Sequence, residues 1–206
     1  LRALSRHFGP HLDDYFIAEY ATDIENYNLE IAAGFQDRYA ISFEGIRYMD
    51  FEGKHPMRKE DKMIYPVNRR INVNEIPFFL ALSNVPKSSA TVHNPVRERL
   101  LHGSPEEQRD IRSTMEEIAL LAEVGENYVS EMKWKKVGIL MNINHKLRRG
   151  ITGLSRREDE EIVDRALKYD ALGAKVAGSG GAVVVLTDRG DKKDVFTKMC
   201  WEYQCV

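Results

Sequence analysis

The chain has 206 residues, of which 43% are hydrophobic and 30% are charged. This composition is typical of a globular protein with enough residues for a core, and it excludes wholesale disorder, collagen and a small disulfide-stapled scaffold. Lys and Arg number 30 against 32 Asp and Glu, so the formal charge is −2. A protein this close to neutral is not a globally basic nucleic-acid binder, and we expect no nucleic-acid partner.

The apolar runs of the chain predict strands rather than membrane spans. The longest, such as 78–82 and 182–186, are far shorter than the ~20 residues that cross a bilayer. The chain opens without a charged-then-apolar leader, and its two cysteines both lie near one end. We therefore expect a cytoplasmic protein with no membrane partner, whose oligomeric state the sequence leaves open.

Hydrophobic periodicity predicts mixed secondary structure in the first part of the chain. In order, we expect a helix over 13–33, a short helix over 36–43, a strand over 46–51, a short strand over 63–67 and a buried strand over 78–83. The charged segment 52–74 contains two prolines. We interpret it as the connection between two lobes.

The second part of the chain is predicted to be richer in helices. We expect helices over 94–103, 105–132 and 134–148, a helix beginning near 155, strands over 174–176 and 182–186, and a last helix over 192–199. The capping box Ser104-Pro105-Glu106-Glu107 starts the longest of these helices. Because helices and strands alternate without a regular βαβ rhythm, we predict an α+β fold with helices packed on an antiparallel or mixed sheet.

A glycine-rich segment lies between the last two predicted strands, at Gly178-Ser179-Gly180-Gly181. Glycines permit positive φ angles and can bring several backbone N–H groups to one point, where they bind an anion. The segment is not a Walker A loop, because no Gly-Lys-Ser/Thr follows it. It is not a dinucleotide fingerprint either, because a strand rather than a helix comes next. The alternative is a hairpin turn that only needs flexible residues.

A single carboxylate stands out after the first predicted helix, within Gly34-Phe35-Gln36-Asp37-Arg38. On a helix, Asp37 is rotated by roughly 200° from Phe35, so we expect its side chain to face a cleft or solvent. It lies in the first turn, where the helix dipole favours the ionised form, and Arg38 is the neighbour that could pair with it. The alternative is an aspartate that only compensates the dipole.

Hydroxyl and basic side chains gather at a predicted strand-to-helix junction, over 88–99. Such a junction suits the binding of an anion or a sugar, through loop N–H groups and a guanidinium. The alternative is that Asn94-Pro95 simply begins a helix and that Arg97 and Arg99 are solvated.

Taken in their order along the chain, these three segments resemble the GHMP kinase superfamily, which includes galactokinase, homoserine kinase, mevalonate kinase and phosphomevalonate kinase. The stretch 173–186 is similar to the third conserved motif of that superfamily, with Ala177 where many members carry threonine. The stretch 34–40 resembles the Gly-x-Gln-Asp segment of sugar-1-kinases, and 88–99 resembles glucuronokinases. The similarity covers about Tyr20 to Leu186 and is closest to glucuronokinase-like sugar-1-kinases.

The resemblance implies a two-lobed sandwich, with a partial N-terminal lobe over 1–60 and a C-terminal lobe over 61–206. It implies ATP-dependent phosphorylation of a sugar or uronic acid hydroxyl, most simply the anomeric one, with ATP and Mg²⁺ as cofactors. Asp37 would be the catalytic base, and Gly178, Ser179, Gly180 and Gly181 would line the phosphate or substrate cleft. The substrate contacts would be Gln36, Arg38, His93 and Arg97, with His93 and Arg97 as alternatives. No residue of this chain is assigned as a metal ligand.

The phosphate loop of the superfamily, Pro-x-x-x-Gly-Leu-Gly/Ser-Ser-Ser-Ala, does not occur in the sequence. ATP and Mg²⁺ would find most of their ligands there, and phosphoryl transfer depends chiefly on such positioning. We therefore expect a longer parent protein to be the kinase and this chain alone to be nearly inactive. The alternative is a non-catalytic member of the superfamily with a binding or regulatory role.

Overall fold

The computed structural model describes residues 2–9, 12–30, 33–54, 64–73, 75–83, 90–152, 157–178, 180–188 and 192–201. The chain forms two compact units, 1–72 and 73–206, each with its own sheet. The predicted lobe boundary between residues 60 and 61 lies outside the described residues and stays a prediction. Within the described ranges, none of the helices combines the length and the apolar character that a membrane span requires.

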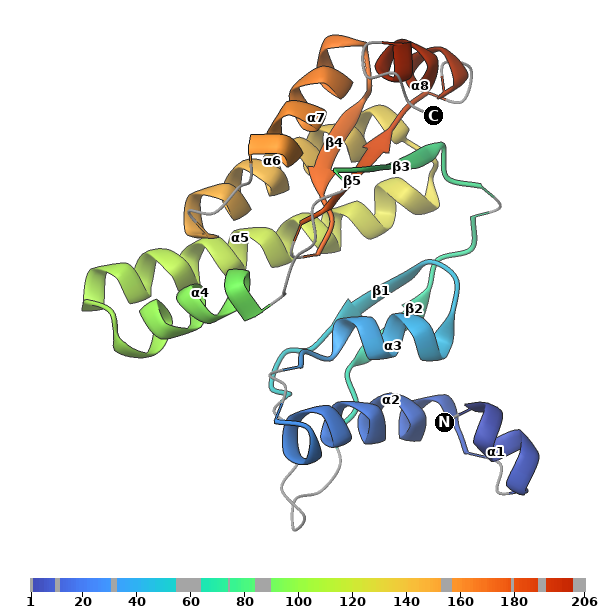
Figure 1. The fold of residues 1–206 in the computed structure, drawn as a ribbon, viewed down its shortest axis with the longest axis vertical. Coiled ribbons are helices and arrows are strands. Elements are labelled where there is room, and N and C mark those ends of the chain that lie inside the picture. The colour runs from blue at the N-terminus through green and yellow to red at the C-terminus, as the bar shows by residue number, and fades with distance from the viewer. Residues whose placement is uncertain are drawn as a thin grey trace. The chain divides into compact units, whose positions relative to one another are not determined.

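Unit 1 is a small layer of helices beside a two-stranded sheet (Figure 1). Its elements are α1 (Arg2–Phe8), α2 (Asp14–Asp23), a π-helical turn η1 (Ile24–Asn28), α3 (Gln36–Phe43), β1 (Arg47–Asp50) and β2 (Val67–Arg70). Helix α2 packs on α3, and β1 pairs with β2 in antiparallel register. The strand expected over 63–67 is wrong over the described residues: 64–66 form no strand, and β2 begins at Val67, where pairing with β1 is available.

The first long helix is shorter than its periodicity predicts. It begins as expected, because the Asp13 carboxylate accepts the Phe16 N–H at 2.7 Å and caps the first turn. The α-helix ends at Asp23, passes through η1 and stops before Glu30, whose φ is +53°. The side chain of Asn26 bonds both to Ala33 and to the helix, and this local competition ends the regular ladder.

Unit 2 packs helices on a three-stranded antiparallel sheet, as the α+β prediction requires. Its elements are β3 (Phe78–Leu82), α4 (Ala90–His102), α5 (Pro105–Ser130), α6 (Trp134–Thr152), α7 (Arg157–Lys168), β4 (Gly173–Val176), β5 (Ala182–Leu186) and α8 (Lys192–Trp201). The strand order is β3-β5-β4, so β5 is central and β3 and β4 are edges. Figure 1 shows α5 and α6 running along each other, which their packing confirms.

The core of unit 2 lies on one face of this sheet. Apolar side chains of β4 and β5 meet α7 and α8 there, and the buried set is Ile162, Val163, Ala166, Ala174, Val183, Val185, Val195 and Met199. Alternation along β5 places Val183 and Val185 on this face, and both are fully buried. Burial of such side chains supplies most of the stability of the unit.

Two expectations about burial in unit 2 are wrong. Strand β3 was predicted to be buried, yet Phe78, Leu80 and Leu82 are exposed, because only the opposite face of β3, with Phe79 and Ala81, packs on the core. Apolar residues at steps of three and four along 105–132 also predict a stripe that faces the core over the whole of α5. Ile111 is buried, but Met115 is 45% exposed, because the stripe is longer than the elements that cover it.

Of two predicted helix starts in unit 2, one agrees with its capping residue and the other does not. The Ser104 box forms as predicted: the Ser104 hydroxyl accepts the Glu107 N–H at 3.2 Å, and the Ser104 N–H reaches the Glu107 carboxylate. Helix α4, by contrast, starts at Ala90 rather than at the predicted Asn94. A capping residue identifies one favourable start, and it does not prevent a preceding turn from joining the helix.

Candidate functional site

The Asp37 carboxylate lies in the first turn of α3 and is 81% exposed, as its rotation from Phe35 predicts. It lines an open hollow of about 720 Å³ within unit 1. The hollow is bordered by α2, α3 and α1, and its polar lining includes Glu25, Arg38 and Glu44. A carboxylate in this position can accept a hydrogen bond from a bound hydroxyl group. Its role as a catalytic base stays a prediction.

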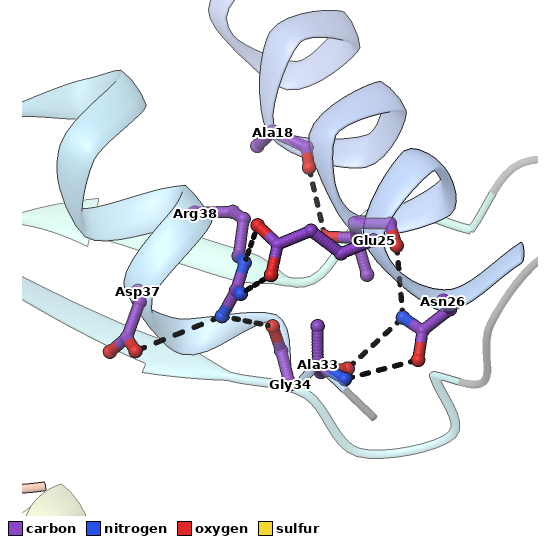
Figure 2. Close-up of polar contacts among 8 residues, drawn as sticks. Ala18, Glu25, Asn26, Ala33, Gly34, Asp37 and Arg38 are labelled. Carbon is purple, nitrogen blue, oxygen red and sulfur yellow. Dashed lines mark hydrogen bonds and ion pairs between the residues drawn. The ribbon is translucent and has the colours of Figure 1, made fainter. Parts of the chain in front are cut away.

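Arg38 is the centre of the polar network beside Asp37 (Figure 2). Its Nε donates to Glu25 Oε1 at 3.0 Å, and its Nη2 pairs with the second oxygen of the same carboxylate. Its Nη1 donates to the Gly34 carbonyl at 3.3 Å and lies 3.7 Å from Asp37 Oδ2. The main partner of Arg38 is therefore Glu25 rather than the adjacent Asp37. Gln36 is exposed at the start of α3.

The turn η1 brings two further residues to this network, and the sequence analysis missed both. Glu25 holds Arg38, and Asn26 holds the backbone of Ala33 from both sides, with two hydrogen bonds of 3.1 Å. Figure 2 shows the two side chains leaving the same turn towards α3 and the segment before it. A π-turn is a frequent device at functional sites. No sequence signal distinguishes it here from a continuous helix.

The glycine-rich turn between β4 and β5 adopts the backbone that its composition predicts. Gly178, Gly180 and Gly181 all have positive φ, at +49°, +105° and +83°. The turn is closed by backbone hydrogen bonds: Ala177 N–H to Ala182 O at 2.8 Å and Gly180 N–H to Ala177 O at 3.0 Å. Ser179 lies outside the described residues. The role of this turn as a lining of the phosphate or substrate cleft stays a prediction.

Two side chains from distant helices contact this turn. The Asp159 carboxylate, on α7 and 1% exposed, accepts the Gly181 N–H at 3.1 and 3.3 Å. The Arg148 guanidinium, on α6, donates to the carbonyls of Val176 at 3.0 Å and Gly178 at 2.5 Å. Arg148 lies near the C-terminal end of α6, where a cation offsets the helix dipole, and nothing in the sequence selects either Arg148 or Asp159 as a site residue. The helix start expected near residue 155 lies outside the described residues.

Helix α4 carries the other two predicted substrate residues. Arg97 is exposed on this helix. His93 is in the helix backbone, and its side chain lies outside the described residues. The predicted site residues thus fall into two groups, one in each unit: Gln36, Asp37 and Arg38 in unit 1, and the glycine turn with His93 and Arg97 in unit 2. The resemblance to GHMP kinases implies that the two groups line one cavity, and this stays a prediction.

The described residues contain no cluster of three His, Cys, Asp or Glu side chains arranged to hold a metal ion. The carboxylates around the Asp37 hollow are oxygen ligands of the kind that Mg²⁺ takes, but they are spread along its wall. Arg38 also occupies the Glu25 carboxylate. No side chain of the described part is therefore assigned to a metal.

Comparison with known proteins finds relatives over most of the chain. Residues 120–204 match the family described as GHMP kinases C terminal. The chain is 37% identical over 171 residues to the probable glucuronokinase 2 of Arabidopsis thaliana and 34% identical over 170 residues to glucuronokinase 1 of the same plant. Each alignment covers 79% of this chain and 43% of the relative, so the chain spans less than half the length of these relatives.

Solved structures support the fold. The crystal structure of L. major mevalonate kinase in complex with R-mevalonate superimposes with a TM-score of 0.73, over 98% of this chain and 58% of that chain, at 22% identity. At this identity the likeness concerns the fold alone. It agrees with the α+β architecture of both units.

Proposed function

We propose that this chain is part of an ATP-dependent sugar kinase. The premise is that it carries the C-terminal domain of a GHMP kinase and is homologous to plant glucuronokinases. The reaction would transfer the γ-phosphoryl group of ATP to a hydroxyl group of a sugar or uronic acid. The anomeric hydroxyl is the acceptor we favour, with a sugar 1-phosphate as product. Among possible substrates we favour a uronic acid, because the similar Arabidopsis proteins are named glucuronokinases.

The observation that carries this proposal is the exposed Asp37 carboxylate in the hollow of unit 1. A carboxylate is a weak base towards a sugar hydroxyl, but it can orient the hydroxyl in line with the γ-phosphorus and accept its proton as the new P–O bond forms. Glu25 holds the fork of Arg38, so that Nη1 stays 3.7 Å from Asp37 Oδ2 rather than bonding directly. Asp37 thereby keeps room for a substrate hydroxyl.

The remaining roles are binding and orientation. Arg38, or Arg97 on α4, would supply the cation that a uronic acid carboxylate needs. The glycine turn would form a wall of the cleft without side chains in the way. ATP supplies the phosphoryl group, and we place most ligands of ATP and Mg²⁺ in a part of the longer protein that this chain does not contain. A non-catalytic, sugar-binding member of the superfamily is the alternative.

The test is Asp37→Asn in a longer protein that includes the phosphate loop. We expect kcat to fall by ~10²- to 10⁴-fold with nucleotide binding retained, because the proton acceptor is lost. The matched control is Asp14→Asn, which removes a carboxylate from the first turn of α2. If Asp37 only compensates a helix dipole, the two variants will behave alike and both will turn over like the wild type. That result would exclude the catalytic role.

A further inference from the structure

The glycine turn is held from both of its strands by side chains that lie far away in the sequence. Arg148, on α6, is 28 and 30 residues from the two carbonyls that it contacts. Asp159, on α7, is 22 residues from Gly181. The carbonyls at the β4 end of the turn therefore face α6, and an N–H at the β5 end faces α7.

The Asp159 contact places a buried charge where two effects stabilise it. The carboxylate lies in the first turn of α7, where the helix dipole favours a negative charge. It also accepts the Gly181 N–H with both oxygens, and a charged acceptor makes a stronger hydrogen bond than a neutral one. A buried carboxylate without such partners would be strongly disfavoured. The position of Gly181 is thus tied to the N-terminus of α7.

The Arg148 contact depends on the shape of the guanidinium group. Its Nη1 and Nη2 reach Val176 O and Gly178 O, two carbonyls separated by one residue across the end of β4. A lysine ammonium is a single point charge and does not reproduce this fork. The position of Gly178 is thus tied to the C-terminal part of α6.

We infer that Asp159 and Arg148 are positioning residues that hold the glycine turn in one backbone conformation before any ligand binds. The inference rests on the proposed function, in which this turn forms a wall of the phosphate and substrate cleft. The N–H groups of Gly180 and Gly181 are engaged inside the protein, so neither can rotate towards a phosphate without breaking its bond. The turn acts by fixed shape, and a displacement of about 1 Å in such a wall can lower the rate ~100-fold.

The first test uses this chain itself and measures amide hydrogen exchange by NMR. Asp159→Ala is expected to raise the exchange rate of the Gly181 amide by at least ~10-fold, since its acceptor is gone. The amide of Val184, in the centre of the sheet, should change much less. The matched control is Ile162→Val, a core change on the same helix, which should leave Gly181 as in the wild type. Unchanged Gly181 exchange in Asp159→Ala would overturn the inference.

The second test compares two adjacent arginines in the longer kinase. Arg148→Lys is expected to lower kcat at least ~10-fold, with a smaller change in KM, because the misplaced turn aligns the reactants poorly. Arg149→Lys is the matched control, because Arg149 pairs with Glu160 instead of the turn. It should keep kcat and KM within about twofold of the wild type.

Asp159 offers a conservative variant for the same assay. Asp159→Asn retains an oxygen acceptor for the Gly181 N–H and should recover most of the turnover that Asp159→Ala loses. Equal losses in both variants, or a wild-type kcat in Arg148→Lys and Asp159→Ala, would overturn the positioning role even if Gly181 exchange changes.

The Asp37→Asn variant separates the two proposals. If it turns over like the wild type, the catalytic proposal fails, and Gly181 exchange still decides whether Asp159 holds the turn. If Asp37→Asn is inactive while Arg148→Lys and Asp159→Ala keep the wild-type kcat, the positioning inference alone fails.

Discussion

At the scale of single residues, the most unusual group in unit 1 is the buried carboxylate of Glu19. It is 2% exposed and accepts hydrogen bonds from the Tyr39 hydroxyl and from Lys54 Nζ at 2.9 Å. Lys54 Nζ also donates to the Ile64 carbonyl at 2.8 Å and lies 4.5 Å from the centre of the Phe35 ring. Burial, followed by the Glu19 contact, raises the pKa of Tyr39 above its usual range. The cluster joins α2, α3 and the turn after β1, and so it sets where α3 presents Asp37.

We predict that Lys54→Met destabilises unit 1 by ~3–5 kcal/mol, because it leaves a buried carboxylate without its cation. Tyr39→Phe removes one hydrogen bond to the same carboxylate and should lower the free energy of unfolding by only ~1–3 kcal/mol. Both tryptophans, Trp134 and Trp201, belong to unit 2. The measurement is therefore hydrogen–deuterium exchange of peptides from 1–72 in increasing urea. A smaller effect for Lys54→Met than for Tyr39→Phe would contradict the prediction.

Lys175 makes the stability of unit 2 depend on pH. Burial, and then the positive charge of Arg148, lower the pKa of Lys175 to about 8, and its Nζ donates to Asn144 Oδ1 at 2.6 Å. In the unfolded chain the pKa returns to ~10.4. Between these two values the unfolded chain binds more protons than the folded one, so the free energy of unfolding rises with pH over this range.

We predict that Lys175→Met is more stable than the wild type at pH 7, because the buried ammonium is removed. The difference should shrink as the pH rises from about 8 to ~10.4, because the wild-type side chain becomes neutral first in the folded state and then, above ~10.4, in the unfolded state as well. Urea unfolding followed by tryptophan fluorescence at pH 7, 8.5 and 10 measures it. A difference that grows with pH would contradict the pKa direction.

At the scale of elements, the edge of β4 is covered by α6 at very short range. A Cβ atom on Gly138 would lie 2.2 Å from the Leu172 carbonyl oxygen, and one on Gly173 would lie 2.6 Å from the Gly138 oxygen. Asn142 Oδ1 accepts the Ala174 N–H at 3.0 Å, so a side chain of the helix takes the place of a neighbouring strand. The same helix carries Arg148 to the glycine turn.

We predict that Gly138→Ala lowers the free energy of unfolding of unit 2 by ~1–3 kcal/mol or more, because the methyl group must push α6 away from β4. Gly150→Ala is the matched control, since it lies on the same helix with no atom within 4 Å of the added Cβ. It should stabilise the helix by up to ~1 kcal/mol. Urea unfolding by tryptophan fluorescence measures both, and a neutral Gly138→Ala would contradict the close contact.

Elements were predicted best where the signal is local. The Ser104 capping box correctly identified the start of α5, and the apolar run 182–186 correctly identified β5. The end of the first long helix was missed, because it depends on the reach of Asn26 to Ala33 seven residues away. The exposure of β3 was missed because a continuous apolar run does not tell whether one face or both faces of a strand are covered.

At the scale of the whole molecule, the residues predicted for the site lie in two separate units, and the chain spans 43% of its glucuronokinase relatives. Unit 1 holds the Asp37 hollow and unit 2 holds the glycine turn. Because each alignment covers only 43% of the relative, these relatives contain residues that this chain does not match. The kinase activity of this chain should therefore be compared with that of a longer protein that includes the missing residues.

We predict that the chain alone transfers phosphate from ATP to free sugars or uronic acids at least ~100-fold more slowly than a longer protein that includes the phosphate loop, because phosphoryl transfer relies on positioned phosphate ligands. A coupled assay of ADP release, with both proteins at equal concentration, measures the ratio. Comparable turnover by the two proteins would refute this expectation.

The sequence alone determined what depends on neighbouring residues: the positive φ angles of the glycine turn, the capped start of α5, the exposure of Asp37 and the resemblance to a kinase superfamily. The tertiary structure alone decided which distant groups meet. Arg38 bonds to Glu25 rather than to its neighbour Asp37, and Arg148 and Asp159 close on the glycine turn. The physical reason is that such contacts depend on the path of the chain between elements that are distant in the sequence, and periodicity and spacing carry no information about that path.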